Sequence, residues 1–161
     1  RLDYFDGLTK IHKIKMRDAK DSLYAKVHIT FDGSVHKTFR GPMRKDRFSN
    51  EVRVLKFLEK KGCDFVPKLL EADEDTLKIV TSNVGTIVNR MSDEKKNKLF
   101  TELESYGVQH DDAEIRNITY NPQMGRFCVI DFEFATILEP GYPPSPKITS
   151  HPNLDTFHEA D

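Results

Sequence analysis

The chain has 161 residues, 37% of them hydrophobic and 10% aromatic, which is enough for one domain, or two small lobes, with a buried core. Charged residues make up 32% of the chain but the formal net charge is only −1, which argues against a strongly basic nucleic-acid-binding protein. Two cysteines lie far apart with no metal-ligand spacing, so we expect no zinc and a reducing, cytoplasmic compartment. For the same reason of charge we expect no nucleic-acid partner, and no apolar run reaches the roughly 20 residues of a membrane helix, so we expect no membrane partner.

The first predicted elements are strands. Residues 10–16 form a plausible strand, and residues 22–31 alternate strictly between apolar and polar side chains. Asp32-Gly33 then gives a strong hairpin signal, and residues 34–39 form the returning strand. The pattern predicts an antiparallel sheet of about three strands.

A predicted helix follows at residues 46–62, where apolar residues recur at helical spacing and Gly62 stands at the C-cap. Residues 65–82 indicate two short strands around an acidic turn. A second helix is predicted at residues 92–107, capped by Ser92.

Residues 117–131 predict a tight hairpin, and the tail from Leu138, with five prolines, is expected to be irregular. The strands are segregated from the second helix along the chain, which indicates an α+β fold rather than a doubly wound sheet.

The residues around this hairpin indicate a chemistry. His110, Asp112 and Asn117 form an H-x-D-x-x-x-x-N motif, and an apolar run at 127–130 leads into Asp131. A short hairpin brings the loop before its first strand close to the end of its second, so Asp112, Asn117 and Asp131 can converge. Phosphoryl transfer needs a carboxylate near the attacking hydroxyl, and a carboxylate with an amide oxygen for Mg²⁺. The simpler alternative is a solvated acidic turn.

The first half of the chain can supply a cation for nucleotide phosphates. Lys37 lies on the returning strand, and Glu51 on the helix can hold its ammonium group in place. Val35 lies on the same strand face and can cover an adenine. The alternatives are an exposed strand lysine at 37 and a surface partner of Arg47 at Glu51.

The chain resembles the protein-kinase-like superfamily from about residue 20 to 135. The matching pieces are VHK at 35–37, NEVRVLKFL at 50–58, HDDAEIRN at 110–117 and VIDFE at 129–133. The resemblance implies a two-lobed α+β fold, with an N-lobe at residues 1–82 and a minimal C-lobe at residues 83–161.

The resemblance also implies roles for individual residues. The implied catalytic residues are Asp112 as base, Lys37 and Asn117, and the implied metal ligands are Asn117 and Asp131. His110 would brace the loop. The segment 80–85 resembles the hinge that binds adenine, so the implied nucleotide contacts are Lys37, Glu51, Val35, Thr81 and Ser82.

Four features depart from the family pattern. Residues 16–22 contain no glycine, so a Gly-rich phosphate loop is missing, and Asp111 replaces an arginine that usually reads a phosphorylated loop. Glu133 replaces the glycine after Asp131-Phe132, which resembles choline and aminoglycoside kinases. Only 28 residues follow Glu133, too few for the usual large lower lobe.

From these observations we expect an ATP- and Mg²⁺-dependent phosphotransferase, a minimal atypical protein serine/threonine kinase. The alternatives are a kinase of a small hydroxyl compound, a pseudokinase that serves as an interaction module, and an α+β binding domain whose motif match is chance. The expected partner is a protein or small-molecule hydroxyl substrate.

Overall fold

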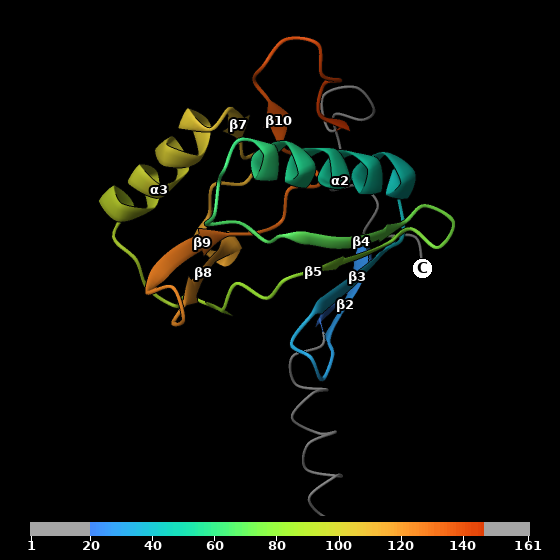
Figure 1. Ribbon diagram of the computed structural model, residues 1–161, viewed down its shortest axis with the longest axis horizontal. Coiled ribbons are helices and arrows are strands. Elements are labelled where there is room, and N and C mark those ends of the chain that lie inside the picture. Colours follow the sequence, from blue (N-terminus) through green and yellow to red (C-terminus); the bar gives the residue numbers. More distant parts are fainter. Residues whose placement is uncertain (1–19, 147–161) are drawn as a thin grey trace, which may run out of the picture.

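The computed structural model describes residues 20–146, so the strand predicted at 10–16 lies outside the described residues. The described part is an α+β fold with two α-helices and antiparallel sheets (Figure 1). The largest sheet has five strands in the order β1-β2-β3-β5-β4. Its strands are β1 (Lys20–Asp21), β2 (Ala25–Ile29), β3 (Val35–Phe39), β4 (Leu69–Asp73) and β5 (Lys78–Thr81).

The β2–β3 hairpin confirms the turn predicted at Asp32-Gly33. The Thr30 N–H donates to the Ser34 carbonyl, and Gly33 takes a φ of +83°, a conformation that glycine adopts without strain. The strand is shorter than the predicted 22–31, because a second tight turn at residues 22–25 delays its start and the turn at residues 30–34 follows its end at Ile29. The Ser22 hydroxyl accepts the Ala25 N–H in the turn at residues 22–25. Phe31, expected on the apolar face, lies in the turn after the strand and is 74% exposed.

The sheet contains three strands that were not predicted to belong to it, β1, β4 and β5. The strands expected within residues 65–82 do form, as β4 and β5, and β5 pairs antiparallel with β3. The sequence predicted both hairpins but gave no signal for which edges would join, because that pairing is set by contacts far apart in the chain.

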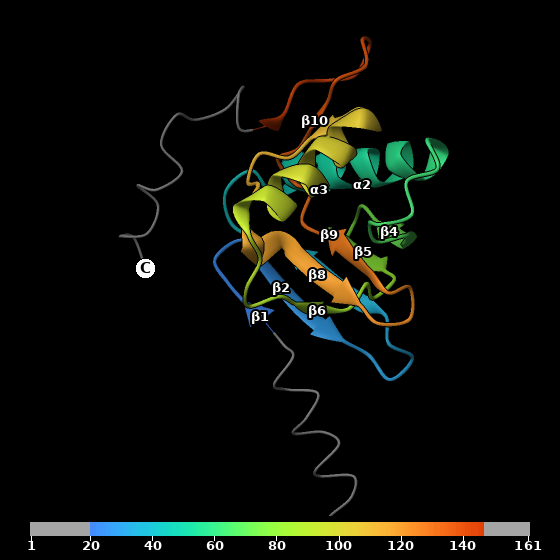
Figure 2. The same ribbon diagram turned by 90° about the vertical axis from the view of Figure 1, so that its left-hand side faces the viewer.

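Helix α2 (Arg44–Lys60) packs against β3, β4 and β5 and lies along one face of the five-stranded sheet (Figures 1 and 2). It follows Met43, which has a φ of +54°, and it ends before Gly62 at a φ of +77°. Its buried apolar residues are Phe48, Val54, Leu55, Phe57 and Leu58. The predicted Val52 lies only partly buried at the edge of this face.

The remaining elements follow β5 in the chain. They are β6 (Thr86–Ile87), α3 (Asp93–Ser105), β7 (Val108–Gln109), the 3-10 helix η1 (Ile115–Asn117), β8 (Ile118–Asn121), β9 (Arg126–Val129) and β10 (Thr136–Ile137). The strands pair in the orders β6-β8-β9 and β10-β7. Ser92 caps α3 as predicted, because its hydroxyl accepts the Lys95 N–H.

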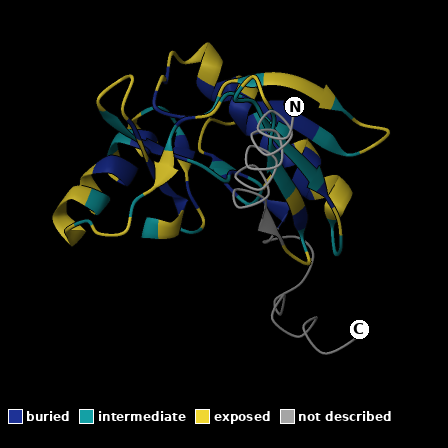
Figure 3. Ribbon diagram, turned by 90° about the horizontal axis from the view of Figure 1, so that it is seen from below, coloured by how far each residue is buried: buried dark blue, intermediate teal, exposed yellow. Residues whose placement is uncertain are grey.

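One apolar core connects these elements to the five-stranded sheet. Residues of α2, α3, β5, β7, β8 and β9 all belong to the same buried cluster, and Figure 3 shows buried residues in both halves of the molecule. The Val129 N–H donates to the Phe65 carbonyl, so β9 is also bonded to the segment that precedes β4. No helix in the described range 20–146 is long and apolar enough to cross a membrane.

We expect Gly85→Ala to destabilise the fold more than Gly33→Ala. Both glycines have positive φ, which costs an alanine about 1–2 kcal/mol. A Cβ at residue 85 would also overlap the Tyr120 carbonyl, whereas a Cβ at residue 33 meets no atom within 4 Å. The overlap adds roughly 1–3 kcal/mol. Urea denaturation of both variants measures the difference, and equal losses would contradict the expectation.

Candidate functional site

The centre of the candidate site is the ammonium group of Lys37 on β3. Its Nζ donates to Glu51 Oε2 on α2 at 2.9 Å and to Asp131 Oδ1, just after β9, at 3.3 Å. A third carboxylate, Glu133 Oε2, lies 3.6 Å from the same nitrogen. The structure therefore brings together three predicted residues separated by 14 and 94 positions in the sequence.

The sheet register explains why Lys37 points toward α2. Lys37 pairs with Val27 on β2 and with Ile79 on β5, and Ile79 is buried in the core. Directly paired residues share a face of the sheet, so Lys37 lies on the face that α2 covers. Its side chain is only 13% exposed, so it is not a solvated strand lysine.

Glu51 is also buried, with a side chain 7% exposed. Its partner is Lys37 rather than Arg47, so it is not a surface residue paired along the helix. Burial raises the pKa of Glu51 to about 7, although the Lys37 ammonium opposes the rise. Burial alone would lower the pKa of Lys37, but attraction to Asp131, Glu51 and Glu133 outweighs it and raises that pKa. Lys37 therefore stays charged at neutral pH.

Asp131 has an unusual backbone for a residue with a side chain. Its φ is +68°, in the left-handed region where non-glycine residues are uncommon and which often marks functional positions. Strand β9 ends two residues earlier, at Val129, and the Asp131 side chain is 43% exposed. This carboxylate therefore contacts Lys37 while its side chain stays partly exposed.

His110 braces the loop before η1. The Asp112 N–H donates to His110 Nδ1 at 3.0 Å, so Nδ1 is the acceptor. The other nitrogen, Nε2, lies 2.9 Å from the Ile130 carbonyl and donates to it in the neutral ring. The ring also packs against Phe100 and Phe132. These contacts link the 110–117 loop to the residue immediately before Asp131, and they fit the predicted structural role.

Asp112 and Asn117 contact each other directly. Asn117 Nδ2 donates to both the main-chain carbonyl and Oδ2 of Asp112, each at 2.9 Å. The amide nitrogen is engaged, so the amide oxygen is what Asn117 can offer a cation. The Asn117 carbonyl accepts the Ile130 N–H at 2.9 Å, which places its backbone next to the chain entering Asp131.

Arg116 belongs to the site although no sequence motif pointed to it. Its Nε and Nη2 donate to the two oxygens of Asp112, each at 2.8 Å. The Arg116 side chain is 68% exposed, so this forked pair is in contact with water. The i,i+4 spacing of the two residues was the available signal.

The predicted nucleotide residues Val35 and Thr81 are directly paired across β3 and β5. Val35 is half-buried and Thr81 is buried. The N–H of Ser82 donates to the Lys68 carbonyl, and its hydroxyl accepts the Lys68 N–H. Both groups of Ser82 therefore bind the neighbouring strand segment.

A cavity of about 440 Å³ lies beside residues 82–85, between the β2–β3 turn and the β8–β9 turn. Ser82 is the one predicted site residue in its wall, while Lys37, Asp112 and Asp131 lie elsewhere. The cavity and the charged cluster are therefore separate features. We place the chemistry at the cluster, because the charged side chains are there.

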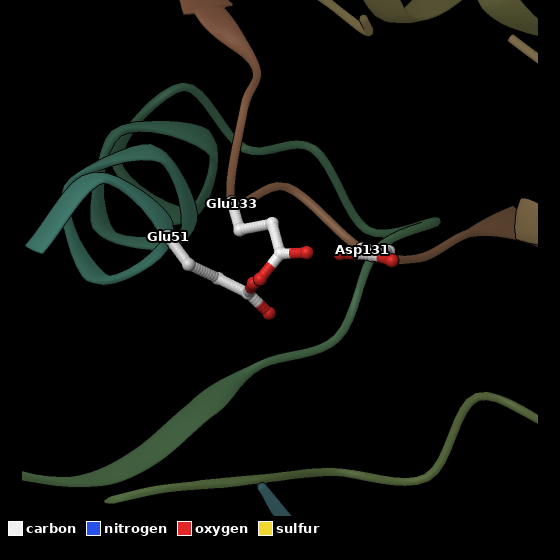
Figure 4. A group of neighbouring side chains, drawn as sticks. All are labelled: Glu51, Asp131 and Glu133. Carbon is white, nitrogen blue, oxygen red and sulfur yellow. The ribbon is translucent and has the colours of Figure 1, made fainter. Parts of the chain in front are cut away.

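The group of carboxylates that could hold a cation differs in part from the predicted metal ligands, Asn117 and Asp131. Oxygens of Glu51, Asp131 and Glu133 lie within 4.8 Å of one another (Figure 4). The sequence assigned the metal to Asn117 and Asp131 and left Glu133 without a role. Lys37 lies within 3.6 Å of all three carboxylates, so its ammonium already balances part of their charge. Asp131 is the most exposed of the three carboxylates.

Two residues of α2 outside the prediction hold the segment after Asp131. Arg47 is fully buried, and its Nη1 donates to Glu133 Oε2 at 3.0 Å. Asn50 Nδ2 donates to the carbonyls of Glu133 at 3.0 Å and Ala135 at 2.9 Å. The 47, 50, 51 spacing places these residues on one helix face with Glu51. The sequence signal was three polar residues on that face.

The comparisons with known proteins leave the family open. No protein-family model matches the chain, and no curated protein matches it. The geometry of the site therefore carries the functional argument alone.

We expect Glu51→Gln to remove a pH dependence of stability. The folded-state pKa of Glu51, about 7, lies above its ordinary 4.5, so protonated Glu51 stabilises the fold at low pH. That contribution is complete below pH 4.5 and is lost as the pH rises through 7. Glutamine does not titrate. The unfolding free energy of the wild type minus that of the variant should fall between pH 5 and pH 8, and a constant difference would contradict the assignment.

Proposed function

We propose that this chain is an ATP- and Mg²⁺-dependent phosphotransferase of the protein-kinase-like type, and that it acts on protein serine or threonine. The observation that carries the proposal is the position of Lys37, bonded to Glu51 and Asp131. An ammonium group fixed by a helix carboxylate beside a possible metal carboxylate is the arrangement that phosphoryl transfer requires.

The loop residues supply the second half of the proposal. Asp112 would accept the proton of the substrate hydroxyl while the hydroxyl oxygen bonds to the γ-phosphorus. The bond between the γ-phosphorus and the β-phosphate oxygen would break, releasing ADP. Magnesium would neutralise the phosphate charge. Asn117 and Asp131 would hold the ion, because amide and carboxylate oxygens are the ligands it prefers.

The proposal requires Asp112 to exchange partners. Its two oxygens bind Arg116 in the structure, so the guanidinium must move for a hydroxyl to reach the carboxylate. An exposed ion pair is weak, usually below about 1 kcal/mol, so this exchange has a small cost.

A non-catalytic nucleotide-binding or interaction module is the second candidate. The tight turn at residues 22–25 supports it, because the turn is bonded down to Arg40 and Arg47 rather than left as an open glycine loop. Such a turn offers fewer N–H groups to phosphates. A small-molecule hydroxyl kinase remains the alternative substrate class, supported by Glu133 after Asp131-Phe132.

We expect Asp131→Ala to lower ATP turnover by roughly 100-fold or more, because it removes a carboxylate that would hold Mg²⁺ beside the reacting phosphates. Asp75→Ala is the matched control, since Asp75 is exposed in the β4–β5 turn. Release of ADP with and without a protein substrate measures both variants. Equal turnover by Asp131→Ala and the wild type would refute the proposed function.

Thermal unfolding with nucleotide separates the two candidates. We expect ATP at about 100 times its Kd to stabilise the chain by roughly 2.7 kcal/mol, and only with Mg²⁺ present. Stabilisation that does not depend on the metal, or none at all, would favour the interaction module. The Asp131→Ala variant should lose the metal-dependent part, while Asp75→Ala should keep it.

A further inference from the structure

Glu133 joins two cations that lie on different elements. Its Oε2 accepts from Arg47 Nη1 at 3.0 Å and lies 3.6 Å from Lys37 Nζ. Arg47 is on α2, Lys37 is on β3, and Glu133 belongs to the segment after Asp131. One carboxylate oxygen therefore connects the sheet, the helix and this segment.

Arg47 extends this connection to the turn at residues 22–25. Besides Glu133, its guanidinium donates to the carbonyls of Tyr24 at 3.0 Å, Pro42 at 2.8 Å and Arg40. It also stacks near the Tyr24 ring, 5.2 Å from the centroid. Removing the Glu133 charge would leave a buried guanidinium without its anion, a state that is strongly disfavoured.

Asn50 fixes the backbone of the same segment. Its amide donates to the carbonyls of Glu133 and Ala135. These bonds hold the main chain two and four residues after Asp131, whose own backbone has a positive φ. The place of Asp131 relative to α2 is thus set by hydrogen bonds within the described part of the chain.

We propose that Glu133 is a positioning residue, which, held by Arg47, keeps Lys37 between Glu51 and Asp131 so that the site is assembled without an outside activating group. This inference rests on the proposed function for its catalytic meaning. Its structural content, the confinement of the Lys37 ammonium, can be tested without any nucleotide.

The test compares Glu133→Gln with Glu139→Gln. Glutamine keeps the size of glutamate and removes its charge. Glu139 is a fitting control, because its carboxylate also pairs with a lysine, Lys61, at 3.3 Å, but at the exposed surface. Glu133→Asp is the second variant, which keeps the charge on a shorter side chain and serves if Glu133→Gln does not fold.

The first readout is proton exchange of the Lys37 ammonium, followed by ¹⁵N NMR in the metal-free chain and assigned with Lys37→Arg. We expect a slowly exchanging signal in the wild type and in Glu139→Gln, and its loss in Glu133→Gln. In Glu133→Asp the exchange should be intermediate. Exchange at the wild-type rate in the Glu133 variants would overturn the proposal.

The second readout is the Kd of a non-hydrolysable ATP analogue with Mg²⁺, measured where circular dichroism shows each variant folded. We expect Glu133→Gln to weaken binding by roughly 10- to 100-fold, because a displaced Lys37 would lose a charged hydrogen bond to the phosphates, and Glu139→Gln to leave it unchanged. Unchanged binding in Glu133→Gln would overturn the proposal that Glu133 positions Lys37 for nucleotide binding. If the wild type binds no Mg²⁺ nucleotide while the Lys37 signal still depends on Glu133, the proposed function fails and the positioning role stands.

Discussion

The structure depends on one charged contact, the Lys37 ammonium among three carboxylates. Glu51, Asp131 and Glu133 come from a helix and from the chain after β9. The side chains of Glu51 and Glu133 are largely buried and would be costly to bury without a cation, whereas the Asp131 side chain is 43% exposed. The cation in turn would be costly without them. Breaking one partner of such a buried pair usually costs about 3–5 kcal/mol, so the cluster fixes how the sheet, α2 and the 131–135 segment meet.

A buried arginine beside this cluster connects it to the rest of the fold. Arg47 binds Glu133 and three main-chain carbonyls, so it ties the turn at 22–25 to the segment that carries Asp131. A guanidinium suits this place because its planar fork donates in several directions at once, which an ammonium group does not do. The polar side chains of Arg47 and Asn50 on α2 are therefore held by specific hydrogen bonds.

Local patterns allowed much of this fold and site to be predicted. Alternation and a glycine turn predicted the β2–β3 hairpin, and helical spacing predicted α2 to within two residues at each end. The H-x-D-x-x-x-x-N motif identified Asp112 and Asn117, which do contact each other. The sequence did not point to Arg116, Arg47 or Asn50. A charged or polar residue on a helix or loop is normally expected to face solvent until its partners are known.

The sequence by itself determined the local elements, since turns, caps and periodic side chains act over a few residues. It also determined which residue types could perform chemistry near Asp131. Only the tertiary structure decided that β5 joins β3, that Glu51 faces Lys37 rather than Arg47, and that Glu133 receives both cations. These pairings connect residues up to 96 positions apart. The balance of desolvation and ion pairing in the folded core determines these pairings. That balance cannot be predicted from a local sequence pattern.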